Sequence, residues 1–187
     1  PRTGLALWKY DLSLRGVNTP PLVIDDVVIA AHSEENVVGT SMGAVVAIDT
    51  SRAGSPLKPA TVSKKAFDLT PNGTKWREDE LMAGRCQPLL IDGRLWIVDD
   101  RAKLWFLDAE NGESVGKRQA LGRMMRASLL YADGKVYAFE ANGRWAIYRP
   151  AANGADIVSK GRLPSGEEVN GSPIGSHGRI YVQSSGS

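Results

Sequence analysis

Short runs of apolar and β-branched residues recur along the chain, and polar pairs such as Asp-Gly and Asn-Gly interrupt them. These runs lack the three- and four-residue apolar spacing of an amphipathic helix, so the pattern predicts strands. Two copies of one unit, a pair of apolar runs joined by Asp-Gly, centre on Gly93 and Gly134. Glycine at that place permits the positive φ of a type I′ turn, which predicts a β-hairpin in each copy. Asp26 and Gly178 occupy the same place in two further copies.

The copies follow one another at a nearly constant spacing. Gly93, Gly134 and Gly178 lie 41 and 44 residues apart, whereas 67 residues separate Asp26 from Gly93, so the first unit carries an insertion. A period of about 40–45 residues with several strands is typical of a β-propeller blade. We therefore predict an all-β fold, a partial arc of about four antiparallel, four-stranded blades from a propeller of seven or eight. The outermost strand of each blade is expected to be the least regular.

The predicted blades make the whole chain, residues 1–187, one propeller segment. Residues 1–16 form the tail of a preceding blade, and residues 17–85 form a blade with an insertion. Residues 86–124 and 125–168 form two further blades, and residues 169–187 form half a blade. Because an incomplete arc would expose large apolar faces, we expect the chain to be part of a longer polypeptide.

Composition narrows the classes of partner. The formal net charge of the 187 residues is +2, with basic residues scattered along the chain, so neither a nucleic acid nor a charged membrane surface is an expected partner. No apolar stretch is long enough to predict a membrane-spanning helix. Cys86 is the single cysteine, which excludes an internal disulfide and a cysteine-based metal cage.

The repeat resembles the quinoprotein-like, or pyrroloquinoline-quinone-like (PQQ-like), β-propeller repeats of bacterial proteins. The resemblance is carried by residues 87–112 and 127–154, by residues 20–54 in a stretched form, and by Thr3-Gly4 with Leu7-Trp8. It implies that Asp49 and Asp108 end third strands and brace the turns that follow. It also implies that Trp8 and Trp76 are docking tryptophans between neighbouring blades. No tryptophan follows Asn111-Gly112 or Asn153-Gly154, which predicts weaker docking there.

A catalytic member of this family would be a quinone-dependent dehydrogenase, which needs PQQ, a Ca²⁺ ion and a carboxylate base. Many such enzymes stack the quinone on a disulfide between adjacent cysteines, which Cys86 alone cannot form. The acidic pairs Asp99-Asp100 and Glu34-Glu35 are interpreted as solvated turn residues. His32 and His177 show no spacing of metal ligands, and both are expected at the surface. No catalytic residue, metal ligand or cofactor is predicted.

Protein contacts are expected where the copies differ. The insertion at residues 55–85 is the leading candidate, with Lys64, Lys65 and Arg77 as possible contact residues. An irregular fourth strand with a mobile loop is the other interpretation of this segment. Arg123 and Arg126 flank two methionines before an innermost strand, where they could bind an anion or a partner carboxylate. A connector held by its methionines is the alternative.

These features predict a non-catalytic, extracytoplasmic propeller that acts as a scaffold for protein–protein contact. Its expected partners are other protein subunits of a larger membrane-associated complex and the remaining blades of the same propeller. Periplasmic location is implied by the resemblance, which extends to the lipoprotein scaffold of bacterial outer-membrane protein assembly. The alternative is a fragment of a PQQ-dependent dehydrogenase that would use PQQ with Ca²⁺. A third hypothesis is a ligand-binding or sensor propeller.

Overall fold

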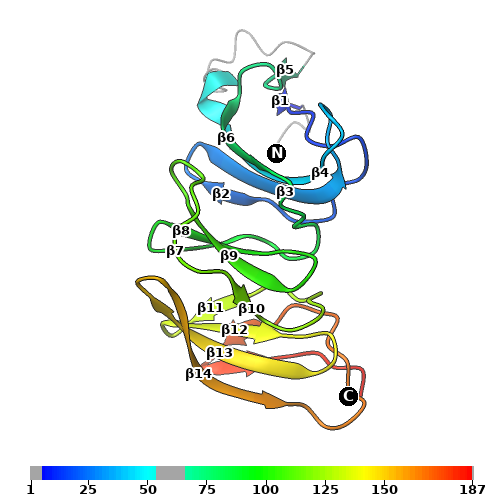
Figure 1. The fold of residues 1–187 in the computed structure, drawn as a ribbon, viewed down its shortest axis with the longest axis vertical. Coiled ribbons are helices and arrows are strands. Elements are labelled where there is room, and N and C mark those ends of the chain that lie inside the picture. Colours follow the sequence, from blue (N-terminus) through cyan, green and yellow to red (C-terminus); the bar gives the residue numbers. More distant parts are fainter. Residues whose placement is uncertain (1–5, 54–65, 187) are drawn as a thin grey trace.

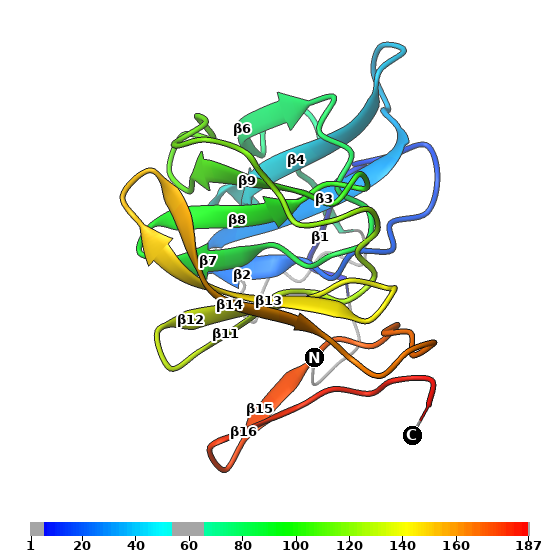
Figure 2. The same ribbon diagram turned by 60° about the horizontal axis from the view of Figure 1, so that its bottom comes forward.

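The computed structural model describes residues 6–53 and 66–186. Three four-stranded antiparallel sheets follow one another along the longest axis of the molecule, in the order of the sequence (Figure 1). A two-stranded hairpin lies beyond the third sheet near the C-terminal end (Figure 2). In each sheet the chain adds strands from one side to the other, which is the arrangement of a β-propeller blade. The all-β fold and the blade architecture predicted from the sequence are confirmed.

The first sheet carries the longest strands at its centre and has the order β2-β3-β4-β6. Its strands are β2 (Leu22–Ile24), β3 (Val27–Glu35), β4 (Met42–Asp49) and β6 (Thr74–Asp79). A 3-10 helix, η1 (Thr50–Ala53), follows β4. The short strands β1 (Trp8–Lys9) and β5 (Phe67–Asp68) pair in parallel beside this sheet.

The second and third sheets repeat this order with shorter connections. The second sheet contains β7 (Leu89–Ile91), β8 (Arg94–Val98), β9 (Lys103–Asp108) and β10 (Gln119–Ala120). The third sheet contains β11 (Leu130–Ala132), β12 (Lys135–Phe139), β13 (Arg144–Ala151) and β14 (Gly154–Arg162). The hairpin that follows is formed by β15 (Ile174–Ser176) and β16 (Arg179–Tyr181).

Tight turns join the first two strands of each unit. Asp92 and Gly93 have φ of 48° and 75°, and Asp133 and Gly134 have φ of 50° and 65°. Positive φ at both central residues is the requirement of a type I′ turn, whose twist matches that of the flanking strands. The hairpins pair β7 with β8 and β11 with β12, and β7 and β11 each lie at the end of their sheet opposite the fourth strand.

The outer strand departs from the expected irregularity in one sheet. Strand β10 has two residues, whereas β14 has nine and pairs with β13 along its length, with one bulge between Ile147 and Tyr148. The prediction of a poorly regular outer strand is wrong for β14. It fails because β13 continues through Pro150 to Ala151 and so offers β14 a longer template.

The core lies between the sheets. Ile29, Val45 and Trp76 of the first sheet pack against Leu95 and Leu107 of the second in one cluster of buried side chains. A second cluster joins the second sheet to the third and contains the perpendicular ring pair Trp96–Phe106, with centroids 4.8 Å apart. Each four-stranded sheet thus buries apolar side chains against the next, as stacked propeller blades do.

Candidate functional site

A polar residue recurs within or just after the second strand of each unit, six residues beyond the hairpin turn. Counted from the hairpin turn, this position holds His32, Asp99, Glu140 and Ser184. Glu140 is 6% exposed, and its Oε2 accepts hydrogen bonds from the Arg123 N–H at 3.2 Å and from Asn142 Nδ2 at 3.3 Å. Buried carboxylates require such partners, so Glu140 holds the connector in place.

Asp99 is committed to its own loop in the same way. Its Oδ1 accepts the N–H groups of Arg101 and Lys103, both at 2.9 Å, and its Oδ2 accepts the indole N–H of Trp105 at 2.9 Å. The neighbouring Asp100 accepts the N–H of Gly84 at 3.2 Å. The acidic pair Asp99-Asp100 therefore orders the loop between β8 and β9 and the connector beside it.

His32 corrects the expectation of a surface histidine. It is 1% exposed, and neither ring nitrogen has a hydrogen-bond partner in the part of the chain that the structure describes. Burial lowers the pKa of His32, and the nearby Arg77 guanidinium lowers it further, so the ring is neutral near pH 7. The sequence could not show this, because the covering connector approaches only in the fold, where the Ala83 N–H bonds to the His32 carbonyl at 3.3 Å.

Arg77 belongs to a polar cluster beside this histidine. The residue lies on β6, so this part of the predicted insertion is the fourth strand and not a loop. Arg77 Nη2 donates to Asn36 Oδ1 at 2.7 Å, and its Nε bonds to Asp79 Oδ1 at 2.7 Å. Arg77 thus has partners within its own sheet, while Lys64 and Lys65 lie outside the described residues.

The two arginines of the connector before β11 also have different surroundings. Met125 between them is 2% exposed and packs in the cluster between the second and third sheets. Arg126 Nη1 donates to Asn170 Oδ1 at 2.6 Å, and the Arg123 N–H contacts Glu140. The connector is therefore anchored by Met125.

The predicted turn residues lie at strand ends. Asp49, the last residue of β4, accepts the hydroxyl of Ser51 at 2.5 Å and the Nε of Arg52 at 3.0 Å. The Ser51 hydroxyl is the main cause that lowers the pKa of Asp49. Asp108, the last residue of β9, accepts the N–H groups of Glu110 and Asn111 at 2.8 and 3.1 Å. Both carboxylates contact the turn that follows the third strand.

The tryptophans assigned to docking lie at different depths. Trp8 on β1 is half-buried beside the apolar cluster of Leu12 and Leu69. Trp76 on β6 is 8% exposed, and its Nε1 donates to the Ala109 carbonyl of the second sheet at 3.0 Å. A Cβ at Gly112 would lie 2.6 Å from the Trp76 ring. The outer strand of the first sheet is thus locked onto the turn after β9.

The next interface has no tryptophan at this position and uses backbone contacts. The Lys117 N–H donates to the Asn153 carbonyl at 3.2 Å, and Gln119 Nε2 donates to the Ala155 carbonyl at 2.6 Å. A Cβ at Gly116 would lie 2.9 Å from the Asn153 backbone. Close approach at glycine therefore replaces the indole between the second and third sheets.

The side chains that could ligate a metal ion are the single cysteine, the histidines and the carboxylates. Cys86 is 1% exposed, and burial raises the pKa of its thiol to about 12. Within residues 6–53 and 66–186, no three His, Cys, Asp or Glu side chains lie close enough together to hold a metal ion.

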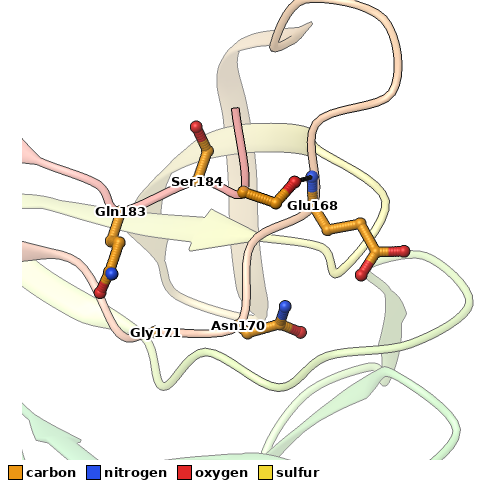
Figure 3. Close-up of a pocket in the computed structure, with 6 residues that line it drawn as sticks. Glu168, Asn170, Gly171, Gln183 and Ser184 are labelled. Carbon is orange, nitrogen blue, oxygen red and sulfur yellow. Dashed lines mark hydrogen bonds between the residues drawn. The ribbon is translucent and has the colours of Figure 1, made fainter. Parts of the chain in front are cut away.

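A hollow of about 310 Å³ lies where the connector before β15 faces the segment after β16 (Figure 3). It is lined by Glu168, Asn170, Gly171, Gln183, Ser184 and Ser185. The Glu168 N–H donates to Ser185 Oγ at 2.9 Å, and the Ser185 N–H donates to the Glu168 carbonyl at 2.9 Å. The lining offers amides, hydroxyls and one carboxylate, which are groups suited to polar contact.

The outer edge of the third sheet carries exposed apolar and basic side chains, unlike the polar hollow. This edge was not predicted from the sequence. Within the described ranges β14 pairs only with β13, so its other edge carries unpaired backbone groups. Ile157 and Val158 on this strand are 55% and 44% exposed. Lys160 and Arg162 follow on the same strand and are also exposed. The run of β-branched residues followed by lysine and arginine is the signal that could have found this edge.

Known proteins resemble this chain in structure. No model of a protein family matches the sequence, and comparison with curated proteins gave no significant match. BamB from Moraxella catarrhalis is 16% identical with a TM-score of 0.56 over 91% of this chain and 56% of its own. The quinohemoprotein alcohol dehydrogenase from Comamonas testosteroni is 22% identical with a TM-score of 0.55 over 85% of this chain and 23% of its own. A europium-containing methanol dehydrogenase is 14% identical with a TM-score of 0.53 over 84% and 27%.

The chain thus spans about half the length of BamB and about a quarter of the length of these dehydrogenases. No helix among residues 6–53 and 66–186 is long and apolar enough to cross a membrane. At these identities the likeness concerns the fold alone, and the sheets, hairpin turns and inter-sheet packing agree with it. The chain has the PQQ-like β-propeller repeat fold.

Proposed function

We propose that this chain is a non-catalytic scaffold segment of an extracytoplasmic β-propeller and that it holds another protein subunit of a larger, membrane-associated complex. One observation carries the proposal: β14 presents exposed apolar and basic side chains on an edge with no partner strand among the described residues. Such an edge is a ready template for another polypeptide.

The polar ends of the strands support the same proposal. Asp99 and Glu140 are bonded to the loops that they order, so their oxygens serve the fold. The fold is shared by BamB and by alcohol and methanol dehydrogenases, so the likeness favours no one activity. The choice of a scaffold therefore rests on the exposed edge and on the structural engagement of these carboxylates.

Two measurements on the full-length protein test the scaffold proposal. Chemical cross-linking in the source cells, followed by purification and mass spectrometry, is expected to yield a stoichiometric protein partner that survives washing. Incubation with PQQ and Ca²⁺, an alcohol or sugar, and an electron-accepting dye is expected to give no reduction above the rate without protein. Substrate-dependent dye reduction, or the lack of any stoichiometric partner, would contradict the scaffold proposal.

A further inference from the structure

We propose that β14 binds an extended, acidic segment of a partner protein, which adds to the third sheet as a fifth strand. The inference rests on the proposed scaffold function and names the surface and the chemistry of its partner. Its basis is the order of side chains along the edge, from apolar Ile157 to basic Lys160 and Arg162. Strand addition supplies main-chain hydrogen bonds, and alternate side chains supply specificity.

The register places these three side chains on one face of the sheet. Ile157 pairs with Tyr148, Lys160 with Ala146, and Arg162 with Arg144. Residues that alternate along β13 share one face, so Tyr148, Ala146 and Arg144 lie on the same side, and their partners on β14 lie there too. The bulge between Ile147 and Tyr148 preserves this arrangement by adding one residue to β14. One face of the edge thus presents an apolar side chain followed by two cations.

The basic side chains of this face are exposed, and two of them lie on directly paired residues. Arg144 and Arg162 lie directly opposite each other, and like charges in such a pair are destabilising. Neither of them, nor Lys160, makes an ion pair within the part of the chain that the structure describes. A carboxylate on a strand added beside β14 would lie next to Lys160 and Arg162 on the same face and offset their positive charge. The expected partner segment therefore has acidic residues at alternate positions, followed or preceded by a β-branched residue.

The backbone of the edge is suited to this role. Asp156 to Lys160 are all exposed, so their outward backbone groups can reach a neighbouring strand. Gly161 carries no side chain because a Cβ there would lie 2.4 Å from the ring of Trp145. Trp145 thus covers the opposite face of the sheet at this point and keeps β14 extended. The edge is long enough to hold a segment of several residues, unlike the two-residue β10.

The test uses two fluorescent heptapeptides, Glu-Thr-Glu-Thr-Val-Thr-Val and the reversed sequence, which cover both strand directions. Anisotropy with the full-length protein is expected to show saturable binding of one of them. A control peptide in which the central threonine is replaced by proline has the same charge and should bind at least about tenfold more weakly, because proline removes a main-chain donor. Equal binding of the proline peptide, or no binding of any peptide, overturns strand addition.

Matched protein variants locate the site. Arg162→Glu should weaken peptide binding by about tenfold or more, which corresponds to about 1.4 kcal/mol. Arg179→Glu makes the same charge change at an exposed arginine of β16 and should change binding less than about twofold. If charge reversal disturbs folding, Arg162→Gln provides a milder change. A variant counts as correctly folded when its thermal unfolding midpoint equals that of the native protein. Equal binding by Arg162→Glu and Arg179→Glu overturns the assignment to β14.

The experiments distinguish failure of docking at β14 from failure of the proposed scaffold function. A stoichiometric protein partner that remains bound to Arg162→Glu keeps the scaffold function and overturns docking at β14. The absence of any partner contradicts the scaffold itself. Binding of a single-stranded oligothymidine in place of both peptides, with loss in Arg162→Glu, would assign the basic edge to nucleic acid and overturn the proposal.

Discussion

The outer strands β6 and β14 occupy equivalent places in the first and third sheets, yet their side chains are used in opposite ways. On β6, Trp76 is buried against the second sheet, and Lys75 and Arg77 are paired with Glu110 and Asp79. On β14, Ile157 and Val158 are exposed, and Lys160 has no ion pair among the described residues. The outer strand therefore buries its tryptophan against the next sheet in one case and leaves its apolar side chains exposed to solvent in the other.

The contrast between β6 and β14 indicates which outer strand is available for contact with another protein. A strand whose apolar side chain locks onto the next sheet cannot change partners without loss of stability. A strand whose apolar side chains face solvent contributes little to the core and is free to contact another chain. The two strands should therefore respond differently to substitution.

Truncation of the docking tryptophan should have the largest effect. Trp76→Ala removes a buried indole and its hydrogen bond to Ala109 and should lower the free energy of unfolding by about 3–5 kcal/mol. Ile157→Ala on β14 should change it by no more than about 0.5 kcal/mol. Urea denaturation of the two variants measures both values. Comparable losses would mean that β14 is as tightly packed as β6, which would contradict the comparison.

Substitution of the glycine that faces Trp76 should cause the second largest loss of unfolding free energy. Gly112→Ala combines a φ of +78° with a Cβ that would meet the indole, and should cost about 3 kcal/mol. Gly93→Ala has a similar φ of +75° but open space, and should cost about 1 kcal/mol. In the Trp76→Ala background the cost of Gly112→Ala should fall toward that of Gly93→Ala. An unchanged cost there would show that the ring does not restrict this turn.

A pH titration probes the polar cluster beside β6. Burial lowers the pKa of His32 in the folded protein, so the unfolded chain binds the proton first as the pH falls through about 6.5. Stability from this residue is present above that pH and is lost below it, by at most about 1.4 kcal/mol per pH unit for one proton. The charged groups around the ring are Glu34, Arg77 and Asp79.

The free energy of unfolding between pH 7.5 and 5 should fall more steeply for the native protein than for His32→Leu. His177→Leu, the same substitution at the exposed hairpin tip, is the matched control. Equal slopes for the native protein and His32→Leu would show that the histidine accepts a proton freely in the fold.

The surface ion pair between the first two sheets should matter least. Lys75 Nζ lies 2.5 Å from Glu110 Oε1, but the glutamate side chain is 82% exposed. Glu110→Gln should therefore lower the free energy of unfolding by less than about 1 kcal/mol, and the loss should shrink at high salt. A larger, salt-independent loss of unfolding free energy, measured by thermal or urea denaturation, would contradict the weak contribution expected of this ion pair.

The spacing of Gly93 and Gly134 was sufficient to predict blades, because a type I′ turn and its two strands are local features. The third strands were also predictable from their apolar runs, and β13 continues beyond its run, through Pro150 to Ala151. Proline is tolerated there near the end of the strand, where it pairs with Ala155. Local pattern thus identified the strands but not the full length of β13.

Features that depend on contact between distant segments could not be predicted. His32 is buried by the connector that contains Ala83, and no sequence pattern near either residue predicts that contact. Arg77 looked like a residue of an inserted loop, because the strand that contains it follows a long segment without a clear pattern. The free edge of β14 also depends on which strands pair, which the sequence of that strand does not determine.

Amide hydrogen exchange of the full-length protein, with and without the strand-forming acidic peptide, tests the central claim most directly. Amides of β14, within residues 154–162, should exchange more slowly when the peptide is saturating, while those of β6, within residues 74–79, should not change. Unchanged exchange in β14, or protection of β6 in its place, would contradict the claim that the two edges have different functions.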